Sequence, residues 1–177
     1  MKDNVALLVI DVQNGLFSIA NAPVYHRERL ISNMLELVDK ARKSNIPVFY
    51  VQHCSERDGL LEPNTQGWKI CSAISPVQGD PIIEKRTPDS FHETLLKEEL
   101  EKRGIQRLVV VGLQTEYCID TTCRRAFSLG YEVTLVEDGH STMDSDILKA
   151  EKIIQHHNSV LGSWFCKVKP AKEIAFI

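Results

Sequence analysis

The chain has 177 residues, of which 43% are hydrophobic and 25% are charged, and its formal net charge is −3 at pH 7. This composition is typical of one globular domain, here residues 1–177, and excludes a disordered chain, a collagen-like repeat and a disulfide-rich miniprotein. Acidic and basic residues are interspersed, so we expect no basic surface and no nucleic-acid partner.

Hydrophobic runs of strand length alternate with amphipathic runs of helix length, which favours a parallel sheet covered by helices. In chain order, the expected strands lie at residues 5–10, 47–52, 82–84, 107–112, 131–137 and 164–168. This alternation predicts an α/β fold, a single-domain three-layer α/β/α sandwich with a six-stranded, mainly parallel sheet in a Rossmann-like order.

The first two expected helices follow the first and third strands. Residues 27–43 carry hydrophobic side chains at the spacing of one helix face, namely Leu30, Met34, Leu37, Val38 and Ala41. Ser90 and Glu93 have the spacing of a capping box, and Gly104 lies where a C-terminal cap is expected. A second helix should therefore begin near Ser90.

Two more helices and one long loop complete the expected organisation. A third helix is predicted over residues 118–129. A fourth is predicted over residues 145–161, with Ile147 on its hydrophobic face and its end at Gly162. Residues 54–79 contain several glycines and prolines without a clear period, and a loop of that length commonly covers an active site or contacts a partner.

The length of the hydrophobic runs and the pattern of cysteines indicate where in the cell the protein is expected. The longest runs, such as residues 5–10 and 108–112, are far shorter than the roughly 20 residues of a membrane-spanning helix. The first residues carry no secretion signal, and the five cysteines include no CxxC pair, so we expect reduced thiols. We therefore predict a cytoplasmic protein that does not bind a membrane.

Three reactive residue types lie where the predicted strands end. Asp11 follows the first strand, Lys85 follows the third, and Cys118 begins the helix after the fourth. Ligands of open parallel sheets bind at the carboxyl ends of the strands, so an acid, a base and a thiol should meet there. The helix start would lower the pKa of Cys118 and favour its thiolate.

Each of these residues also has an ordinary interpretation. Asp11 could cap the end of a strand, and Cys118 could be a small buried hydrophobic residue. Lys85 could be a solvated surface lysine, with the neighbouring Arg86 as the functional cation.

Several other site types are disfavoured by the motifs. The chain has no GxGxxG or GxxxxGKS phosphate loop and no GxSxG serine motif. Gln13 occupies the position where a phosphatase of the Asp-x-Asp type would carry a second carboxylate. His156 and His157 are adjacent, which is a poor chelating spacing, so we expect no metal and no cofactor.

Three separated motifs resemble the isochorismatase-like cysteine hydrolase family. They are LLVIDVQNG at residues 7–15, EK at 84–85 followed by DSF at 89–91, and GLQTEYC at 112–118. The similarity extends from about residue 5 to residue 168. The resemblance implies a catalytic triad of Asp11, Lys85 and Cys118. It also implies a cis peptide at Leu113-Gln114 and an oxyanion hole formed by the amides of Gln114 and Cys118.

The resemblance implies hydrolysis of a C–N bond in a small amide, lactam or ureide. Lys85 would favour the Cys118 thiolate, which would attack the carbonyl carbon and form a thioester. Asp11 would take the thiol proton, pass it to the leaving nitrogen and then activate water.

Two features limit the choice among activities of this family. Nicotinamidases of the family carry an Asp-x-His and a further His after the second strand, whereas residues 52–56 here read QHCSE. Isochorismatases proper carry a small residue in place of the nucleophile, so Cys118 argues against vinyl-ether cleavage. A vinyl-ether hydrolase, and a noncatalytic dimeric binding or scaffold protein, remain as alternatives.

The pocket should be formed by residues that flank the triad in sequence or belong to the long loop. We expect its walls to include Gln13, Leu16, Phe17, His53, Trp68 and Tyr117. The expected partner is a small-molecule amide-type substrate. The resemblance further implies a homodimer or a higher homo-oligomer, whose partner subunit would add wall residues.

Overall fold

The computed structural model describes residues 4–176, and in these residues six strands form one sheet in which all neighbouring strands are parallel. The strands are β1 (Val5–Ile10), β2 (Val48–His53), β3 (Ile82–Lys85), β4 (Arg107–Leu113), β5 (Glu132–Ser141) and β6 (Lys167–Lys169). Their order is β3-β2-β1-β4-β5-β6, so the chain winds outward from β1 in one direction and then in the other. The predicted parallel sheet is confirmed.

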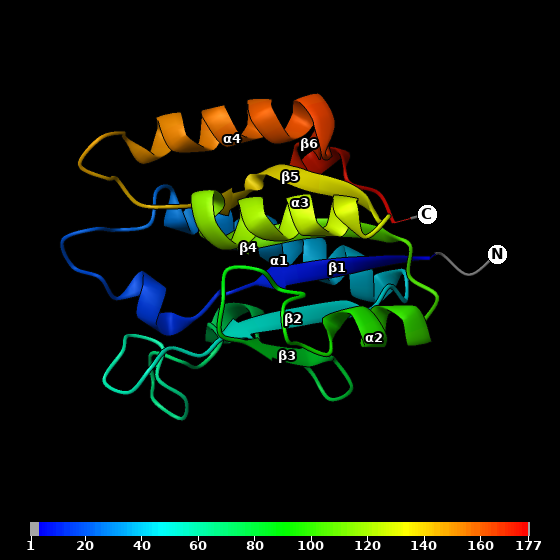
Figure 1. Ribbon diagram of the computed structural model, residues 1–177, viewed down its shortest axis with the longest axis horizontal. Helices are drawn as coiled ribbons and strands as arrows, with labels where there is room; N and C mark the ends of the chain where they lie inside the picture. The colour runs from blue at the N-terminus through cyan, green and yellow to red at the C-terminus, as the bar shows by residue number, and fades with distance from the viewer. Residues whose placement is uncertain (1–3, 177) are drawn as a thin grey trace.

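Helices cover both faces of this sheet (Figure 1). One face packs against α1 (Arg27–Lys43), whose bounds agree with the prediction. The other face is covered by three helices, α2 (Leu96–Lys102), α3 (Asp120–Ser128) and α4 (Ala150–Trp164). The three-layer α/β/α sandwich is therefore confirmed.

Alternate side chains of β1 enter the two hydrophobic cores. Leu7 and Val9 pack in the core beneath α1, and Leu8 and Ile10 pack in the core beneath α2 and α3. All six residues of β1 are buried because both faces are covered, which explains its continuous hydrophobic run. The central strand therefore ends at a fixed position between the two cores.

The second helix begins later than its capping-box spacing predicts. The Ser90 hydroxyl lies 2.8 Å from the Thr122 hydroxyl of α3 and does not cap a helix. Glu93 has a left-handed backbone with φ 53°, which interrupts any helix at that point. The prediction of a helix from Ser90 was wrong, and α2 starts at Leu96. Gly104 follows the helix with φ 67°, as its predicted cap position requires.

The third helix also begins later than predicted. A π-helical turn at Thr115–Ile119 precedes α3, so Cys118 lies in that turn and outside the α-helix. The strand that follows is longer than predicted, because β5 continues to Ser141 through a register shift opposite β4.

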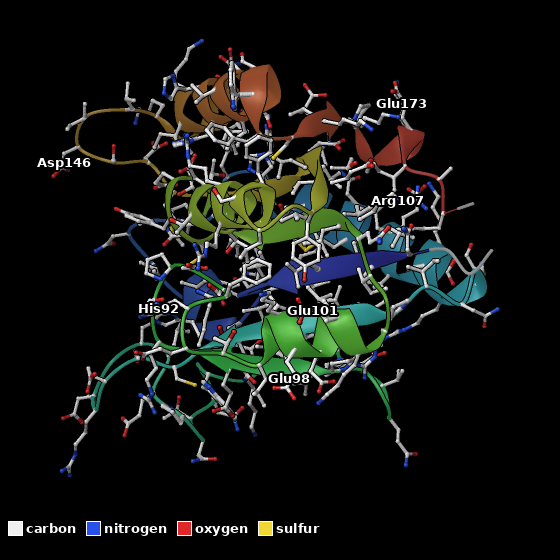
Figure 2. All side chains as sticks on the ribbon, turned by 45° about the vertical axis from the view of Figure 1, so that its right-hand side comes forward. His92, Glu98, Glu101, Arg107, Asp146 and Glu173 are labelled. Carbon is white, nitrogen blue, oxygen red and sulfur yellow. The ribbon has the colours of Figure 1, made fainter. Side chains whose placement is uncertain are left out.

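The fourth helix starts five residues later than predicted. The Asp144 carboxylate accepts a hydrogen bond from the amide of Ala150 at 2.9 Å, and the Ser145 hydroxyl accepts one from the Leu148 amide at 3.0 Å. These bonds hold a loop ahead of α4, and Figure 2 shows Asp146 on this loop, standing away from the helices. Ile147 is 89% exposed, so its assignment to a buried helix face was wrong.

The end of α4 and the last strand are also displaced from their predicted positions. The helix continues through Gly162 to Trp164, so β6 begins at Lys167 and not at residue 164. A Cβ atom on Gly162 would lie 3.0 Å from Val168 Cγ2. The glycine therefore allows α4 to lie close to β6 and does not end the helix.

None of the helices in residues 4–176 has the length and apolar character needed to cross a membrane.

Candidate active site

Three side chains meet at the carboxyl end of the sheet. Asp11 follows β1, Lys85 ends β3, and Cys118 lies in the turn after β4. The ammonium nitrogen of Lys85 lies 2.7 Å from Asp11 Oδ2 and 3.0 Å from Cys118 Sγ. The fold thus brings an acid, a cation and a thiol into direct contact from three distant segments of the sequence.

The backbone of Asp11 turns its side chain toward this cluster. Ile10 faces the core beneath α2 and α3, so regular strand alternation would direct the next side chain to the opposite face. Asp11 has φ 52°, a left-handed conformation that interrupts the alternation and that aspartate tolerates better than most residues. Its carboxylate therefore lies on the same face as Lys85, whose neighbour Ile83 packs in that core.

Gly112 sets the close spacing of β1 and β4 below the cluster. A Cβ atom at this position would lie 2.1 Å from the carbonyl oxygen of Ile10, and the residue has φ 133°. Only glycine fits both requirements without moving β4. The strand that carries the Cys118 turn is consequently held directly beside the strand that carries Asp11.

The ammonium group of Lys85 is enclosed by acceptors. Besides Asp11 and Cys118, it donates to the carbonyl oxygen of Thr87 at 3.0 Å and lies 3.4 Å from His53 Nδ1. Burial alone would lower the pKa of Lys85, but Asp11 and Cys118 outweigh burial and raise that pKa. Lys85 therefore remains a cation at neutral pH, and its interpretation as a solvated surface lysine was wrong, because its side chain is fully buried.

One oxygen of the Asp11 carboxylate takes no part in the ion pair with Lys85. Its side chain is 2% exposed, and Oδ2 forms the ion pair with Lys85. Oδ1 is buried and has no hydrogen-bond partner among residues 4–176. Buried carboxylate oxygens are normally hydrogen-bonded, so this oxygen is available to accept a proton beside the thiol.

Cys118 is a neutral thiol at rest. Burial, together with the negative charge of Asp11, raises the pKa of Cys118 to about 12, although Lys85 acts in the opposite direction. The expectation of a lowered pKa was wrong, because the sulfur is enclosed next to a carboxylate and does not lie at the exposed start of a helix. Formation of the thiolate therefore requires an acceptor for its proton, and Asp11 is adjacent.

His53 adjoins the cluster of Asp11, Lys85 and Cys118 from β2. Residues His53 and Lys85 are direct partners in the β2–β3 ladder, so their side chains share a face of the sheet. Burial and the charge of Lys85 lower the pKa of His53, which is therefore neutral at pH 7. The three protons of the Lys85 ammonium face the closer acceptors on Asp11, Thr87 and Cys118, and His53 Nδ1 is a longer contact at 3.4 Å.

The long loop is attached to the sheet through Gln13. The Gln13 amide donates to the carbonyl oxygens of His53 at 3.0 Å and Trp68 at 2.8 Å, and its oxygen accepts from the His53 amide at 2.8 Å. The side chain is fully buried, so Gln13 holds the loop in place. Trp68 is half-buried, and its indole N–H donates to Cys54 Sγ at 3.3 Å.

The other expected wall residues differ in exposure. Leu16 is buried in the core beneath α1, and Phe17 packs against the same core with the Arg27 guanidinium 5.0 Å from its ring centre. Tyr117, immediately before the nucleophile candidate, is 54% exposed. Of these three aromatic and aliphatic groups, Tyr117 is the one that faces solvent beside Cys118.

Buried polar residues behind the turn of Cys118 were missed by the sequence analysis. Thr115 Oγ1 lies 2.8 Å from His140 Nδ1, and His140 Nε2 lies 2.9 Å from Asn158 Oδ1. The signal for His140 was the polar segment at residues 140–142, which was expected to lie beyond the fifth strand. The structure includes residues 140 and 141 in β5 and buries all three.

Metal ligands are not grouped in the described part of the chain. Among residues 4–176, no three His, Cys, Asp or Glu side chains are arranged to hold a metal ion.

Comparisons with known proteins identify relatives of this chain. Residues 5–155 match the family model described as the isochorismatase domain. The chain is 34% identical over 170 residues to the uncharacterized isochorismatase family protein YddQ of Bacillus subtilis, covering 93% of this chain and 94% of that protein. It is 31% identical over 159 residues to nicotinamidase 3 of Arabidopsis thaliana, covering 82% of this chain and 77% of that protein. The solved structure of a putative isochorismatase hydrolase from Oleispira antarctica has a TM-score of 0.92 at 30% identity, covering 98% of this chain and 96% of that one.

Proposed function

This chain belongs to the isochorismatase family of hydrolases, and we propose that it is a cysteine-dependent hydrolase of a C–N bond in a small amide, lactam or ureide. The observation that carries the proposal is the position of Lys85 Nζ, which contacts both the Cys118 thiol and the Asp11 carboxylate. A nucleophile, a proton acceptor and a charge that stabilises the thiolate are thereby combined in one buried cluster. The name of one relative, nicotinamidase 3, supports amide chemistry as the reaction class.

The first half of the reaction forms a covalent intermediate. The Cys118 thiol transfers its proton to Asp11, and the resulting thiolate is stabilised by the Lys85 ammonium group. Sulfur attacks the substrate carbonyl carbon, forming a C–S bond and an oxyanion. Collapse of this intermediate breaks the C–N bond while Asp11 returns the proton to the leaving nitrogen, which leaves a thioester on Cys118.

The second half releases the acid. Asp11, again a carboxylate, removes a proton from water as the water attacks the thioester carbonyl. The C–S bond breaks, and the proton held by Asp11 returns to sulfur. Lys85 keeps its proton throughout, in agreement with its raised pKa, and its role is to balance the negative charge that passes between sulfur and carboxylate.

The amides of Gln114 and Cys118 are our candidates for the oxyanion hole. The amides of Tyr117 and Ile119 both donate to the Gln114 carbonyl oxygen, at 3.2 and 3.1 Å. This turn folds Cys118 back toward Gln114. Two convergent backbone donors are the usual means of stabilising a tetrahedral oxyanion.

A panel of small amides, ureides and lactams, assayed for release of ammonia or amine, tests the proposed reaction class. We expect turnover of at least one compound in the panel and none of isochorismate. The chemical reason is that a thiolate serves to attack an acyl carbon, whereas cleavage of an enol ether needs only a proton delivered to carbon. Isochorismate turnover without any amide turnover would assign the vinyl-ether reaction, and inactivity toward both classes would favour a noncatalytic binding protein.

Hydrolysis should not depend on a metal ion. The proposed steps use only water and the side chains of Asp11, Lys85 and Cys118, and residues 52–56 lack the Asp-x-His pattern that the sequence analysis associates with nicotinamidases. We expect unchanged kcat and KM on the accepted substrate after exhaustive treatment with EDTA and 1,10-phenanthroline. Loss of activity that zinc, iron or manganese restores would show that His53 and another group form a metal site.

A further inference from the structure

The turn that carries Cys118 is joined to α4 by a chain of hydrogen bonds that the proposed reaction steps do not use. Thr115 opens the turn, and its hydroxyl oxygen lies 2.8 Å from His140 Nδ1 on β5. His140 Nε2 lies 2.9 Å from Asn158 Oδ1 on α4, and Asn158 Nδ2 donates to the carbonyl oxygen of Glu137 at 3.2 Å. Three side chains thus connect the turn to a helix on the sheet surface.

The carbonyl oxygen of Glu137, at the end of this series of hydrogen bonds, fixes the direction of each bond back to Thr115. The carbonyl of Glu137 can only accept, so the amide nitrogen of Asn158 faces it and the amide oxygen faces His140. His140 therefore donates from Nε2 and must accept at Nδ1. The Thr115 hydroxyl is consequently the donor to His140, and none of the partners can be exchanged without breaking a bond.

The Thr115–His140 end of this series of hydrogen bonds is shielded from water, whereas Asn158 is half-buried. Thr115 is fully buried and His140 is 3% exposed. Burial lowers the pKa of His140 to about 4, against the smaller effect of its bond to Asn158, so the ring is neutral at physiological pH. The other charged or titratable groups that act on this ring are His157 of α4, which lowers the pKa, and Asp138 of β5, which raises it.

A second bond attaches the same turn to the segment after β5. The Thr142 hydroxyl donates to Glu116 Oε1 at 2.8 Å. Successive residues of the turn, Thr115 and Glu116, are therefore each held by a polar group from the end of β5 or just beyond it. On the other side of the turn, Cys118 Sγ lies 3.0 Å from Lys85 Nζ.

We propose that Thr115, His140 and Asn158 are positioning residues that hold the nucleophile turn against Lys85 and Asp11. The effect on turnover rests on the proposed function, whereas the effect on the environment of Cys118 does not. Loss of the Thr115 bond would let the turn move outward, which reduces the burial of Sγ and separates it from Asp11 and Lys85. Burial and the Asp11 charge raise the pKa of Cys118 by more than Lys85 lowers it, so the pKa should fall when all three effects weaken. Catalysis should then fall while the thiol becomes easier to alkylate.

The test compares Thr115→Val, which keeps the shape but removes the donor, with Thr115→Ser, which keeps the donor. On the accepted substrate, Thr115→Val should lower kcat about 10²-fold, the loss typical of a misplaced reacting group, with a smaller change in KM. Its Cys118 should react at least about tenfold faster with iodoacetamide near neutral pH, because each unit by which the pKa falls raises the thiolate fraction about tenfold. Thr115→Ser should resemble the unmodified protein in both measurements.

Tyr50→Phe is the matched control, since it also removes one buried hydroxyl hydrogen bond, to Arg42, but on the face covered by α1. It should leave both rates unchanged. Asn158→Leu removes the hydrogen bond between α4 and His140. It should shift both rates in the same directions as Thr115→Val, and it replaces Thr115→Val in the test if that variant does not fold. If Thr115→Val and Asn158→Leu fold and their Cys118 reacts with iodoacetamide at the rate of the unmodified protein, the proposal is overturned. A shifted alkylation rate in a protein that hydrolyses no amide would support it while rejecting the proposed function.

Discussion

Replacing Cys118 with alanine is expected to abolish hydrolysis of the accepted substrate while leaving the protein folded. The sulfur atom is the only protein atom that bonds to carbon in the proposed reaction, and Asp11 and Lys85 cannot replace it. Alanine removes one sulfur that contacts Lys85 but leaves the Lys85–Asp11 ion pair in place. The measurements are kcat on that substrate and the midpoint of thermal unfolding.

Cys71→Ala is the control for this substitution. Cys71 is half-buried within the long loop of residues 54–79, and its thiol takes no part in the proposed reaction. This variant should keep the kcat of the unmodified protein. Near-normal turnover by Cys118→Ala would contradict covalent catalysis, whatever the behaviour of the control.

Replacing Asp11 with asparagine is expected to slow hydrolysis by about 10² to 10⁴, the usual contribution of a proton-transfer group. Asparagine suits the left-handed backbone at this position, so the substitution removes the charge without adding backbone strain. The same substitution should speed alkylation of Cys118 by iodoacetamide near neutral pH. The sign follows from the electrostatics, because the Asp11 charge raises the pKa of Cys118, and Lys85, which lowers it, remains.

Opposite changes in turnover and alkylation would separate the two roles of the carboxylate. A more reactive thiol that hydrolyses the substrate more slowly means that Asp11 is needed as a proton carrier and not for thiol reactivity. Asp80→Asn, which removes the partner of Arg42 in an ion pair distant from the triad, should change neither rate. Equal loss of both activities in Asp11→Asn would point to a collapsed site.

The convergence of Asp11, Lys85 and Cys118 at one edge of the sheet could be predicted from local signals in the sequence. Asp11 follows β1 and Lys85 ends β3, two strands whose hydrophobic residues mark their limits, and parallel strands place their carboxyl ends at one edge of the sheet. Residues 27–43 form α1 as predicted, because five core residues at helical spacing leave no other way to bury that face.

The elements that were misplaced depend on contacts between distant segments. Ser90 and Glu93 have the spacing of a capping box, but the Ser90 hydroxyl pairs with the Thr122 hydroxyl, and no local pattern indicates that partner. Gly162 resembles a helix end, yet it accommodates Val168 across the packed interface of α4 and β6. Local propensity gave the correct type of element in each case, and tertiary packing set its limits.

The raised pKa of Cys118 and the contacts of His140 could not be predicted from the sequence, because both depend on contacts between distant segments. The effect of a helix start on the pKa of a thiol can be predicted from sequence, but the burial of Cys118 beside Asp11 cannot. Burial is the largest effect on the pKa of Cys118. His140 follows a segment that was expected to end at residue 137, so its position inside β5 and its contact with Thr115 depend on the register shift opposite β4.

The most direct test of the account is the mass of the intact protein after rapid acid quenching during turnover. We expect a species heavier by the acyl part of the amide substrate, with the added mass on the peptide that contains Cys118 and with one ammonia or amine released for each acyl group transferred to sulfur. The species should be absent from Cys118→Ala. Efficient turnover of isochorismate, unaffected by Cys118→Gly and without an adduct from any amide, would contradict it.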